Sequence, residues 1–450
     1  MLISIINEEN NSTKSFERKK NIFILTLIGI ILGGLLYFRD VLNIGISKYI
    51  YLLIIAVGFI SLNLKYMVGL LCFLIPLYNG LPSNYISGLF FAVFFIKTFK
   101  SNKIHFSNIQ CCLFLIIIIF EIINVTTTTF TNLIYFIFEF GLIFMLLNLK
   151  KDYYNSKLNI VMFSLGTIVF CILALFIGLK YFEFDSFITG KTRFGDITEY
   201  YGVMRPQMVL TLDPNFIGLF CLVAISSILV IMKGSSLVMK VLLIAISFIL
   251  TFFGFLTLSR TFMILYVILI CIVLFNLLIQ KNIKVKIMAI IFGVLLLYLL
   301  LIINQYVPEL FETLEGRLNS ENSGTLGGRT QIIEEYLVKF FEHPSNLIIG
   351  RGLVSQQYNL DIPKQIHTSS LQYLIGYGVV GSCILIIFCF NSIKKFIYNK
   401  NNKNYLFGFV PLIFYLVYTQ LLPSAYPFEY VFPSILTLYA LQSFNEKGYL

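Results

Sequence analysis

The chain has 450 residues, of which 58% are hydrophobic and only 12% are charged. Roughly a quarter of the residues of an ordinary soluble protein are charged, so this composition excludes a soluble globular protein. The formal net charge of +11 at pH 7 does not indicate a nucleic-acid partner, because the lysines lie in short connections between apolar segments.

The apolar segments are about 17–22 residues long, which fits a hydrocarbon layer about 30 Å thick. In chain order we expect spans near residues 21–38, 49–64, 66–82, 85–97, 109–125, 130–148, 158–179, 216–232, 241–258, 262–279, 287–303, 369–390, 405–422 and 430–444. With the N-terminus in the cytoplasm, every second connection carries lysines, as the positive-inside rule requires. The two segments beside residues 79–83 are short, and together they could form one excursion that returns to the same side. The sequence therefore predicts an all-α polytopic membrane protein with 12–14 transmembrane helices and both termini in the cytoplasm.

Two connections are long, residues 180–215 and 304–368, and both are expected on the outer face. The predicted organisation is a cytoplasmic tail (1–20), N-terminal transmembrane helices (21–179), a first large outer loop (180–215), central transmembrane helices (216–303), a second large outer loop (304–368), C-terminal transmembrane helices (369–444) and a cytoplasmic tail (445–450). The ATP-binding motif G-x-x-x-x-G-K-[ST] does not occur, so the free energy for any reaction on the outer face must come from the substrate itself.

The eight cysteines all fall within apolar segments and form no C-x-x-C pair: Cys72, Cys111, Cys112, Cys171, Cys221, Cys271, Cys383 and Cys389. A free thiol in such a segment usually packs as a small hydrophobic residue. We therefore expect no disulfide, no metal site and no other cofactor.

The arginines are distributed differently from the lysines. Of eight arginines only Arg18 is expected in the cytoplasm, and the others fall on the outer side: Arg39, Arg193, Arg205, Arg260, Arg317, Arg329 and Arg351. Any compact positive charge satisfies the topology rule, so arginines on the disfavoured side need another reason. Bidentate binding of phosphate or carboxylate is the reason that we favour.

The first outer loop ends with 200-YYGVMRPQMVLTLDPN-215. Asp213 can cap a helix whose first residue is Pro214, which places Asn215 on the first turn at the membrane surface. A plain helix cap accounts for Asp213, but it does not account for Arg205, which stands in an uncharged run.

Arg260, in 254-GFLTLSRTFMILYVILI-270, lies between two apolar runs joined by almost no loop. Because burying a cation at mid-membrane depth costs about 2.5–3.5 kcal/mol, we favour an anionic partner over a snorkelling arginine.

The second outer loop contains 328-GRTQIIEEYLVKFFEHPSN-346, in which apolar residues recur at helical spacing. This pattern predicts an amphipathic helix over residues 329–342, ended by Pro344, that lies against the membrane or the helical body. Gly328 precedes the helix and Arg329 stands in its first turn, where free N–H groups and a guanidinium together favour an anion. Arg351 follows in a Gly-Arg-Gly turn.

The loop ends at His367, one of only three histidines, followed by the capping residues Thr368, Ser369 and Ser370. The positive end of the following helix favours a neutral imidazole, which can accept a proton near pH 7. His367 is therefore the candidate general base.

These elements in this order resemble the O-antigen ligase and Wzy-type polymerase superfamily: an arginine, D-P-N at a helix start, S-R-T after a short gap, G-R at a second helix start, and H-T-S-S-L-Q-Y-L followed by G-Y-G-V-V-G. The resemblance runs from about Arg205 to Gly381. The family often has asparagine after this histidine, whereas here the residue is Thr368.

The resemblance implies a GT-C-like fold in the cell membrane and glycosyl transfer on the outer face from glycans carried on undecaprenyl pyrophosphate. It assigns His367, Arg260 and Arg329 to catalysis, and Arg205, Arg351, Asn215, Asp213, Gly328 and Thr368 to substrate and pyrophosphate binding. A polymerase for capsule, exopolysaccharide or O-antigen is favoured over a ligase that transfers the glycan to lipid A core, protein or wall polymer. Membrane lipids, a flippase and a chain-length regulator are the expected partners.

A flippase for the same lipid-linked glycan is the alternative from another class. Flippases are expected to have internal repeats and charged groups deep within their helices. No repeat is evident, but Glu121 and Glu139 interrupt apolar segments, where they could face a cavity or simply be protonated.

Overall fold

The computed structural model describes residues 12–99, 103–195, 213–232, 235–280, 282–319, 329–362, 366, 368–397, 405–422 and 428–446. These residues are almost entirely helical, and an isolated bridge between Ile104 and Leu149 is the one β-type contact among them. A helix satisfies its backbone hydrogen bonds within one segment, which an apolar solvent requires. The predicted all-α fold class is confirmed.

The N-terminal part comprises α1 (Ser12–Leu36) with the π-helical turn η2 (Tyr37–Val41), α2 (Lys48–Ser61), α3 (Leu64–Leu74) with the 3-10 turn η3 (Ile75–Gly80), α4 (Ser83–Phe99), α5 (Asn108–Asn124), α6 (Phe130–Leu147), η4 (Lys151–Tyr153) and α7 (Ser156–Gly178). The central part comprises α8 (Phe184–Ile188), α10 (Pro214–Met232), α11 (Leu237–Leu256), α12 (Arg260–Ile279) and α13 (Ile283–Tyr306). The C-terminal part comprises α14 (Pro308–Asn319), α15 (Arg329–Phe341), α16 (Pro344–Ile349), α17 (Gln356–Leu360), α18 (Ser369–Phe396), α19 (Tyr405–Gly408), α20 (Val410–Thr419), α21 (Phe428–Val431) and α22 (Pro433–Glu446).

Seven helices of the described chain are long and apolar enough to cross a membrane: Phe16–Val41, Phe130–Leu147, Ser156–Gly178, Pro214–Met232, Leu237–Leu256, Arg260–Ile279 and Ser369–Phe396. Shorter apolar helices cover Lys48–Ser61, Leu64–Gly80, Ser83–Phe99, Asn108–Asn124 and Val410–Thr419. The chain is an all-α polytopic membrane protein. The number of spans and the cytoplasmic placement of both termini stay predictions.

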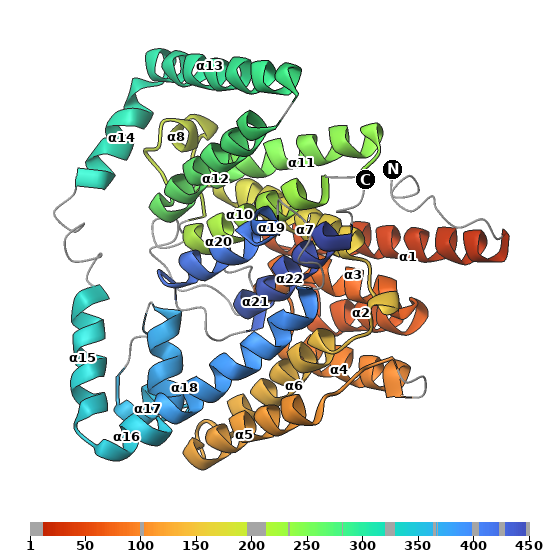
Figure 1. Cartoon of the computed structure of the whole chain (residues 1–450), viewed down its shortest axis with the longest axis vertical. Helices are drawn as coiled ribbons and strands as arrows, with labels where there is room; N and C mark the ends of the chain where they lie inside the picture. The colour runs from red at the N-terminus through yellow and green to blue at the C-terminus, as the bar shows by residue number, and fades with distance from the viewer. Residues whose placement is uncertain are drawn as a thin grey trace.

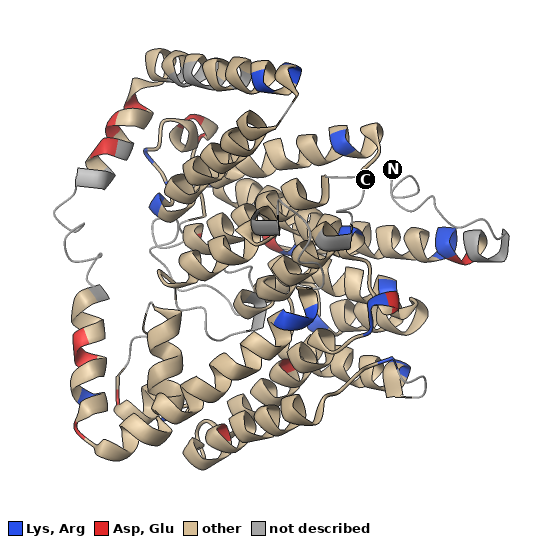
Figure 2. Ribbon diagram, in the orientation of Figure 1, with Lys and Arg blue, Asp and Glu red and all other residues tan. Residues whose placement is uncertain are grey.

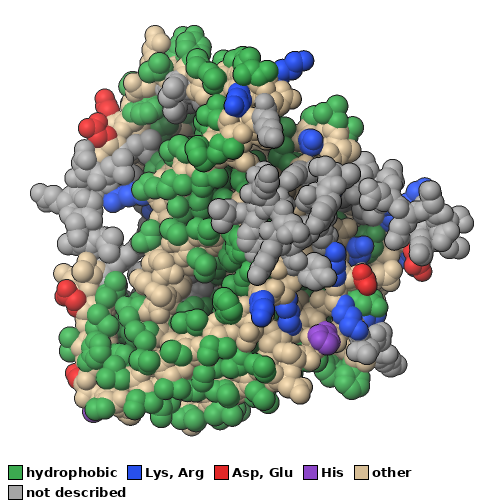
Figure 3. Space-filling view, in the orientation of Figure 1, with side chains coloured by type: hydrophobic (Ala, Val, Ile, Leu, Met, Phe, Trp, Pro, Cys, Tyr) green, Lys and Arg blue, Asp and Glu red, His purple; other side chains and the backbone are tan. Residues whose placement is uncertain are grey.

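Helices α7, α10 and α22 pack together at the centre of the molecule (Figure 1). Helix α10 is buried along most of its length, whereas α12 exposes apolar residues such as Val267 and Phe275. Hydrophobic side chains cover much of the surface in Figure 3, and charged residues gather mostly near helix ends and connections (Figure 2). This pattern is typical of a surface that faces lipid.

The 304–368 segment contains more helix than the sequence predicted. Besides α15, which begins at Arg329 and ends at Phe341, it holds α14, α16 and α17. Pro344 is the first residue of α16 as well as a stop for α15, because the N–H that proline lacks would be unpaired there. The sequence predicted only that Pro344 ends α15, and the structure shows that it also begins α16.

The apolar face of α15 packs against the protein itself. Tyr336 and Phe340 are fully buried in a small separate core with Leu360, Ile366 and Ile375. Burial raises the pKa of the Tyr336 hydroxyl far above its usual range. The apolar face of α15 thus packs against α16, α17 and the first turns of α18.

Candidate functional site

Helix α10 begins at the residue that the sequence predicts. Asp213 Oδ1 accepts a hydrogen bond from the backbone N–H of Asn215 at 2.7 Å, and Pro214 is the first helical residue. Asp213 therefore satisfies one of the N–H groups left unpaired at a helix start. The Asn215 side chain remains available to the neighbouring elements.

Arg193 connects the start of α10 to the turn between α11 and α12. Its Nη2 donates to Asn215 Oδ1 at 3.4 Å, and its Nε donates to the backbone oxygen of Thr257 at 3.2 Å. The next residue, Phe194, donates its N–H to the oxygen of Leu256 at 3.1 Å, which holds this stretch along the end of α11. The sequence showed Arg193 as one of several arginines on the predicted outer side, but no motif marked it as a site residue.

The turn between α11 and α12 is tight and strained. Leu258 has a φ of 49°, in the left-handed region, which costs about 1–2 kcal/mol for a residue with a side chain. Ser259 then caps α12 by accepting from the N–H of Phe262 at 3.5 Å, and Arg260 is the first helical residue. Arg260 thus lies at a helix N-terminus and not in the middle of a span. A cation at the positive end of a helix adds to the positive potential there, which favours an anion.

A hydrogen-bonded chain joins α10, α12 and α20. Ser259 Oγ donates to Asn215 Oδ1 at 3.3 Å, and it also shares a hydrogen bond with the Tyr418 hydroxyl at 2.9 Å. Gly218 on α10 makes this approach possible, because a Cβ there would collide with the Tyr418 hydroxyl. Ser259 and Tyr418 are both buried, so these bonds are shielded from solvent.

The start of α18 lies beside the same end of α20. Ser369 Oγ donates to the backbone oxygen of Thr419 at 2.9 Å, one residue beyond Tyr418. Ser370 Oγ donates to Gln420 Oε1 at 2.6 Å. Thr368 is the N-cap residue of α18, although its side chain makes no capping hydrogen bond. The starts of three long helices therefore lie around the end of α20.

We call this group the helix-start cluster: Arg193, Asp213, Asn215, Ser259, Arg260, Ser369 and Tyr418. Each helix N-terminus carries a partial charge of about +0.5 from its unpaired N–H groups. Two guanidinium groups beside these helix starts outweigh the single carboxylate of Asp213, which makes the cluster a candidate site for an anion such as a phosphate.

Of the other predicted site residues, the structure describes Arg329 and Arg351 but not the remaining three. Arg205, Gly328 and His367 lie outside the residues that the structure describes. Arg329 is the first residue of α15, as predicted. The backbone N–H of Arg351 bonds to the oxygen of Ile375 at 2.9 Å, about 9 Å along α18 from Ser369. The sequence missed Ser259 and Tyr418 because a capping serine and a tyrosine in an apolar helix are both common.

The Gly-Arg-Gly turn at residues 350–352 is locked onto the body of the protein. Gly350 has a φ of 79°, and a Cβ there would collide with the backbone of Gly376 on α18. From α5, Glu121 accepts hydrogen bonds from the N–H groups of Leu353 at 2.9 Å and Val354 at 3.3 Å. Glu121 therefore anchors the 304–368 segment, which gives this carboxylate a role outside ion or substrate transport.

The second buried carboxylate also has a partner. Glu139 on α6 accepts a hydrogen bond from Ser87 Oγ on α4 at 3.3 Å. Glu121 and Glu139 were the sequence features that favoured a flippase, and both bond to neighbouring elements.

These observations define an all-α polytopic membrane protein with a candidate anion site where three helices begin. Residues 245–386, which include Arg260, Arg329, Arg351 and His367, match the family model described as O-antigen ligase. This domain supports membership of the O-antigen ligase and Wzy-type superfamily, so the resemblance seen in the motifs is confirmed. Members of the family are glycosyltransferase-like enzymes that act on lipid-linked glycans. No curated protein matches the chain.

Proposed function

We propose that this protein is a polysaccharide polymerase that acts at the outer leaflet of the cell membrane. It would transfer a growing glycan from undecaprenyl pyrophosphate to a hydroxyl of the next lipid-linked repeat unit. The acceptor oxygen attacks the anomeric carbon, the bond from that carbon to the diphosphate oxygen breaks, and the diphosphate leaves with the bonding electrons. The hydroxyl proton passes to a base, for which His367 is the candidate.

The observation that carries the proposal is the helix-start cluster. A leaving diphosphate gains negative charge in the transition state, and preorganised donors at that position stabilise it without a metal ion. Arg193 and Arg260 lie beside the starts of α10 and α12, and Asn215 links the two starts through Ser259. Removal of one preorganised donor of this kind costs about 10²–10³-fold in rate.

The remaining assignments extend from this cluster. Arg205, Arg329 and Arg351 are proposed to bind pyrophosphate, with Gly328 and Thr368 beside them. General base catalysis by His367 would contribute about 10²–10⁴-fold. The free energy for the reaction is that of the glycosyl–diphosphate bond, so neither nucleotide nor metal is needed. A flippase would supply the substrate to the outer leaflet, and a chain-length regulator would act on the product.

A ligase is the second candidate, because the matched family model is described as O-antigen ligase and the match fits both reactions. The chemistry is the same, and only the acceptor differs. A ligase would transfer the glycan to lipid A core, protein or wall polymer.

The acceptor is tested with purified protein in detergent and lipid-linked repeat units as the sole substrate. A polymerase yields a ladder of longer lipid-linked glycans from this substrate alone. A ligase yields none until a separate acceptor is added. A flippase forms no covalent bond, so it would give no new glycan in either mixture, and that outcome would reject both enzyme assignments.

A further inference from the structure

Helix α5 packs against α6 and α18, and a lysine joins the three helices at one end (Figure 1). The ammonium of Lys395, in the last turn of α18, donates to Gln110 Oε1 in the first turn of α5 and to Asn148 Oδ1 at the C-cap of α6. Lys395 is nevertheless exposed. We call Gln110, Asn148, Ser392 and Lys395 the Lys395 junction.

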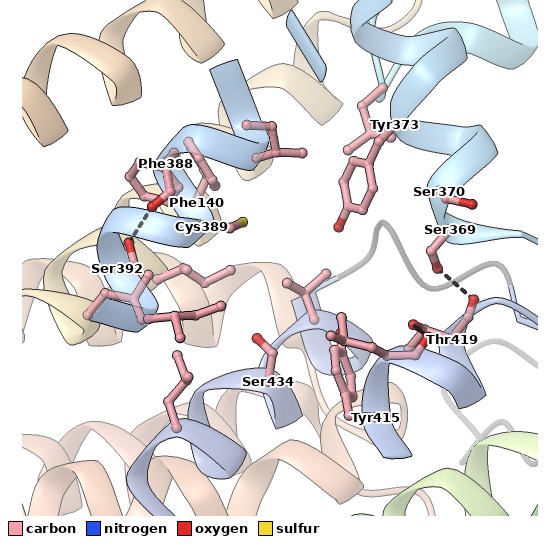
Figure 4. A pocket seen from close by; sticks show the side chains of 18 of the residues that line it. Phe140, Ser369, Ser370, Tyr373, Phe388, Cys389, Ser392, Tyr415, Thr419 and Ser434 are labelled. Carbon is pink, nitrogen blue, oxygen red and sulfur yellow. Dashed lines mark hydrogen bonds between the residues drawn. The ribbon is translucent and has the colours of Figure 1, made fainter. Parts of the chain in front are cut away.

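Both amide oxygens of the junction are held toward the ammonium. Gln110 Nε2 donates to Ser392 Oγ at 3.4 Å, and Ser392 donates in turn to the backbone oxygen of Phe388 at 2.8 Å (Figure 4). Asn148 Nδ2 donates to the backbone oxygen of Phe144 at 2.8 Å. Because each amide nitrogen has its own acceptor, each amide oxygen is left for the lysine. An ammonium has three N–H donors, and no described residue accepts the third.

The charge of Lys395 has no carboxylate partner in the described part of the chain. The two amides are neutral, and the positive start of α5 opposes the negative ends of α6 and α18. The positive-inside rule accounts for lysines at this end of the helices, but not for an ammonium that two oriented amides fix in place. A fixed cation with a free donor favours an anion from outside the protein.

Two neighbouring segments add lysines beside the junction. The backbone N–H of Lys150 donates to the oxygen of Lys103 at 2.9 Å, which holds both residues close to Asn148. Lys394 is exposed next to Lys395. Asp152 is the one acidic residue in the three stretches that meet here, residues 103–110, 148–157 and 390–397. The junction therefore lies in a region of positive charge.

An exposed apolar stripe on α18 leads to these lysines. Ile386, Phe390 and Lys394 are four residues apart, so they lie on one face of the helix. Ile386 is 66% exposed and Phe390 is 69% exposed. Apolar side chains that end in a lysine suit a membrane lipid, because an acyl chain can lie along them while its phosphate meets the ammonium. A free phosphate or an acidic peptide would not cover the stripe.

We infer that the Lys395 junction binds the headgroup of an anionic phospholipid, with the phosphate on Lys395 and Lys394 and an acyl chain along Ile386 and Phe390. The sequence predicts this end of the helices in the cytoplasm, where anionic lipids attract basic segments. The inference does not depend on the proposed function, since the junction lies at the opposite end of α18 from Ser369 and the helix-start cluster.

Lys395→Met and Lys394→Gln test the inference on the full-length protein in a neutral detergent. Native mass spectrometry compares phosphatidylglycerol, which has a net negative charge, with phosphatidylcholine, which has none. Wild type should prefer phosphatidylglycerol, and each substitution should weaken its binding about fivefold. If Lys395→Met fails to fold, Lys394→Gln still tests the inference, because the Lys394 side chain is exposed and makes no hydrogen bond within the described chain.

Lys240→Gln is the matched control. Lys240 is exposed on α11, which packs against α7, α10 and α12. This substitution removes one positive charge, as the test variants do, and should leave the binding of phosphatidylglycerol unchanged. Glycerol 3-phosphate has the phosphate without acyl chains, so it should bind wild type about tenfold more weakly than the lipid, or worse.

Four results would overturn the inference. Equal binding of phosphatidylglycerol by wild type and all variants, or an equal loss in Lys240→Gln, would show that the junction does not hold the headgroup. Equal affinity for phosphatidylcholine would show that the net charge of the lipid is not recognised. Glycerol 3-phosphate bound as tightly as the lipid would identify a site for a free phosphate ester. A glutamate-rich peptide that displaces phosphatidylglycerol would identify a protein-binding surface instead.

Discussion

Replacement of Ser259 by alanine is the sharpest test of the helix-start cluster. Ser259 is 1% exposed, and its hydroxyl makes three contacts: with the N–H of Phe262, with Asn215 Oδ1 and with the Tyr418 hydroxyl. Loss of an N-cap costs about 0.5–2 kcal/mol, and each further hydrogen bond is worth about 1 kcal/mol net. We therefore expect Ser259→Ala to destabilise the protein by about 2–4 kcal/mol.

The expected effect of Ser259→Ala on activity follows from the position of Ser259 beside Asn215 and Arg260. Without Ser259, Asn215 loses one of its two fixed partners and the first turn of α12, which carries Arg260, loses its cap. A displacement of about 1 Å at a reacting site can reduce a rate about 10²-fold. The expected loss of glycosyl transfer is therefore about 10–100-fold.

Ser227→Ala is the matched control. Ser227 is also 1% exposed, it lies on α10, and its hydroxyl has no hydrogen-bond partner among the described residues. Exchange of such a hydroxyl for hydrogen should be neutral or slightly stabilising. Thermal unfolding in one detergent and initial rates of transfer give both quantities. Equal stability and equal rates for Ser259→Ala and Ser227→Ala would refute the reasoning.

A double-mutant cycle isolates the bond between α12 and α20. Tyr418→Phe keeps the ring and removes only the hydroxyl that meets Ser259 at 2.9 Å. The two substitutions should show a coupling of about 1 kcal/mol in unfolding free energy. A coupling of zero would mean that the two hydroxyls do not interact in solution.

Three further predictions concern the charged site residues and the anchor of the 304–368 segment. Arg260→Ala and His367→Ala should leave the protein folded and stop product formation, so that single lipid-linked repeats accumulate. Long chains in either variant would mean that the assigned site is wrong. Glu121→Gln should lower the unfolding free energy by about 1–3 kcal/mol, because an amide can accept only with one of the two atoms that now meet Leu353 and Val354; an unchanged melting curve would count against the anchor. Gly350→Ala should destabilise the protein by about 2 kcal/mol or more, because Gly350 has a left-handed backbone and a Cβ there would collide with Gly376. Gly316→Ala should stabilise it by about 0.5–1 kcal/mol, because Gly316 lies on an exposed helix with nothing near its Cβ. Equal effects of the two substitutions would argue against the packed turn.

Much of the local structure follows from nearest neighbours in the chain. Asp213 and Pro214 mark the start of α10 because capping and the missing proline N–H act within one turn. The spacing of Tyr336 and Phe340 predicts the amphipathic α15 because a helix brings such residues to one face. The short helices α16 and α17 were missed because five or six residues give too little periodicity to read. Helix α14, with 12 residues, was also missed.

The sequence by itself determined that this protein is helical, lies in a membrane and carries arginines at helix starts, since apolar length, capping and charge act locally. Only the tertiary structure decided which helix starts lie together. Arg193, Ser259 and Tyr418 are far apart in the chain, and their hydrogen bonds exist because α10, α12 and α20 pack side by side. Likewise, Glu121 is paired because α5 lies against the turn after Gly352. Packing between distant segments depends on the shapes of all of them, which no local pattern records.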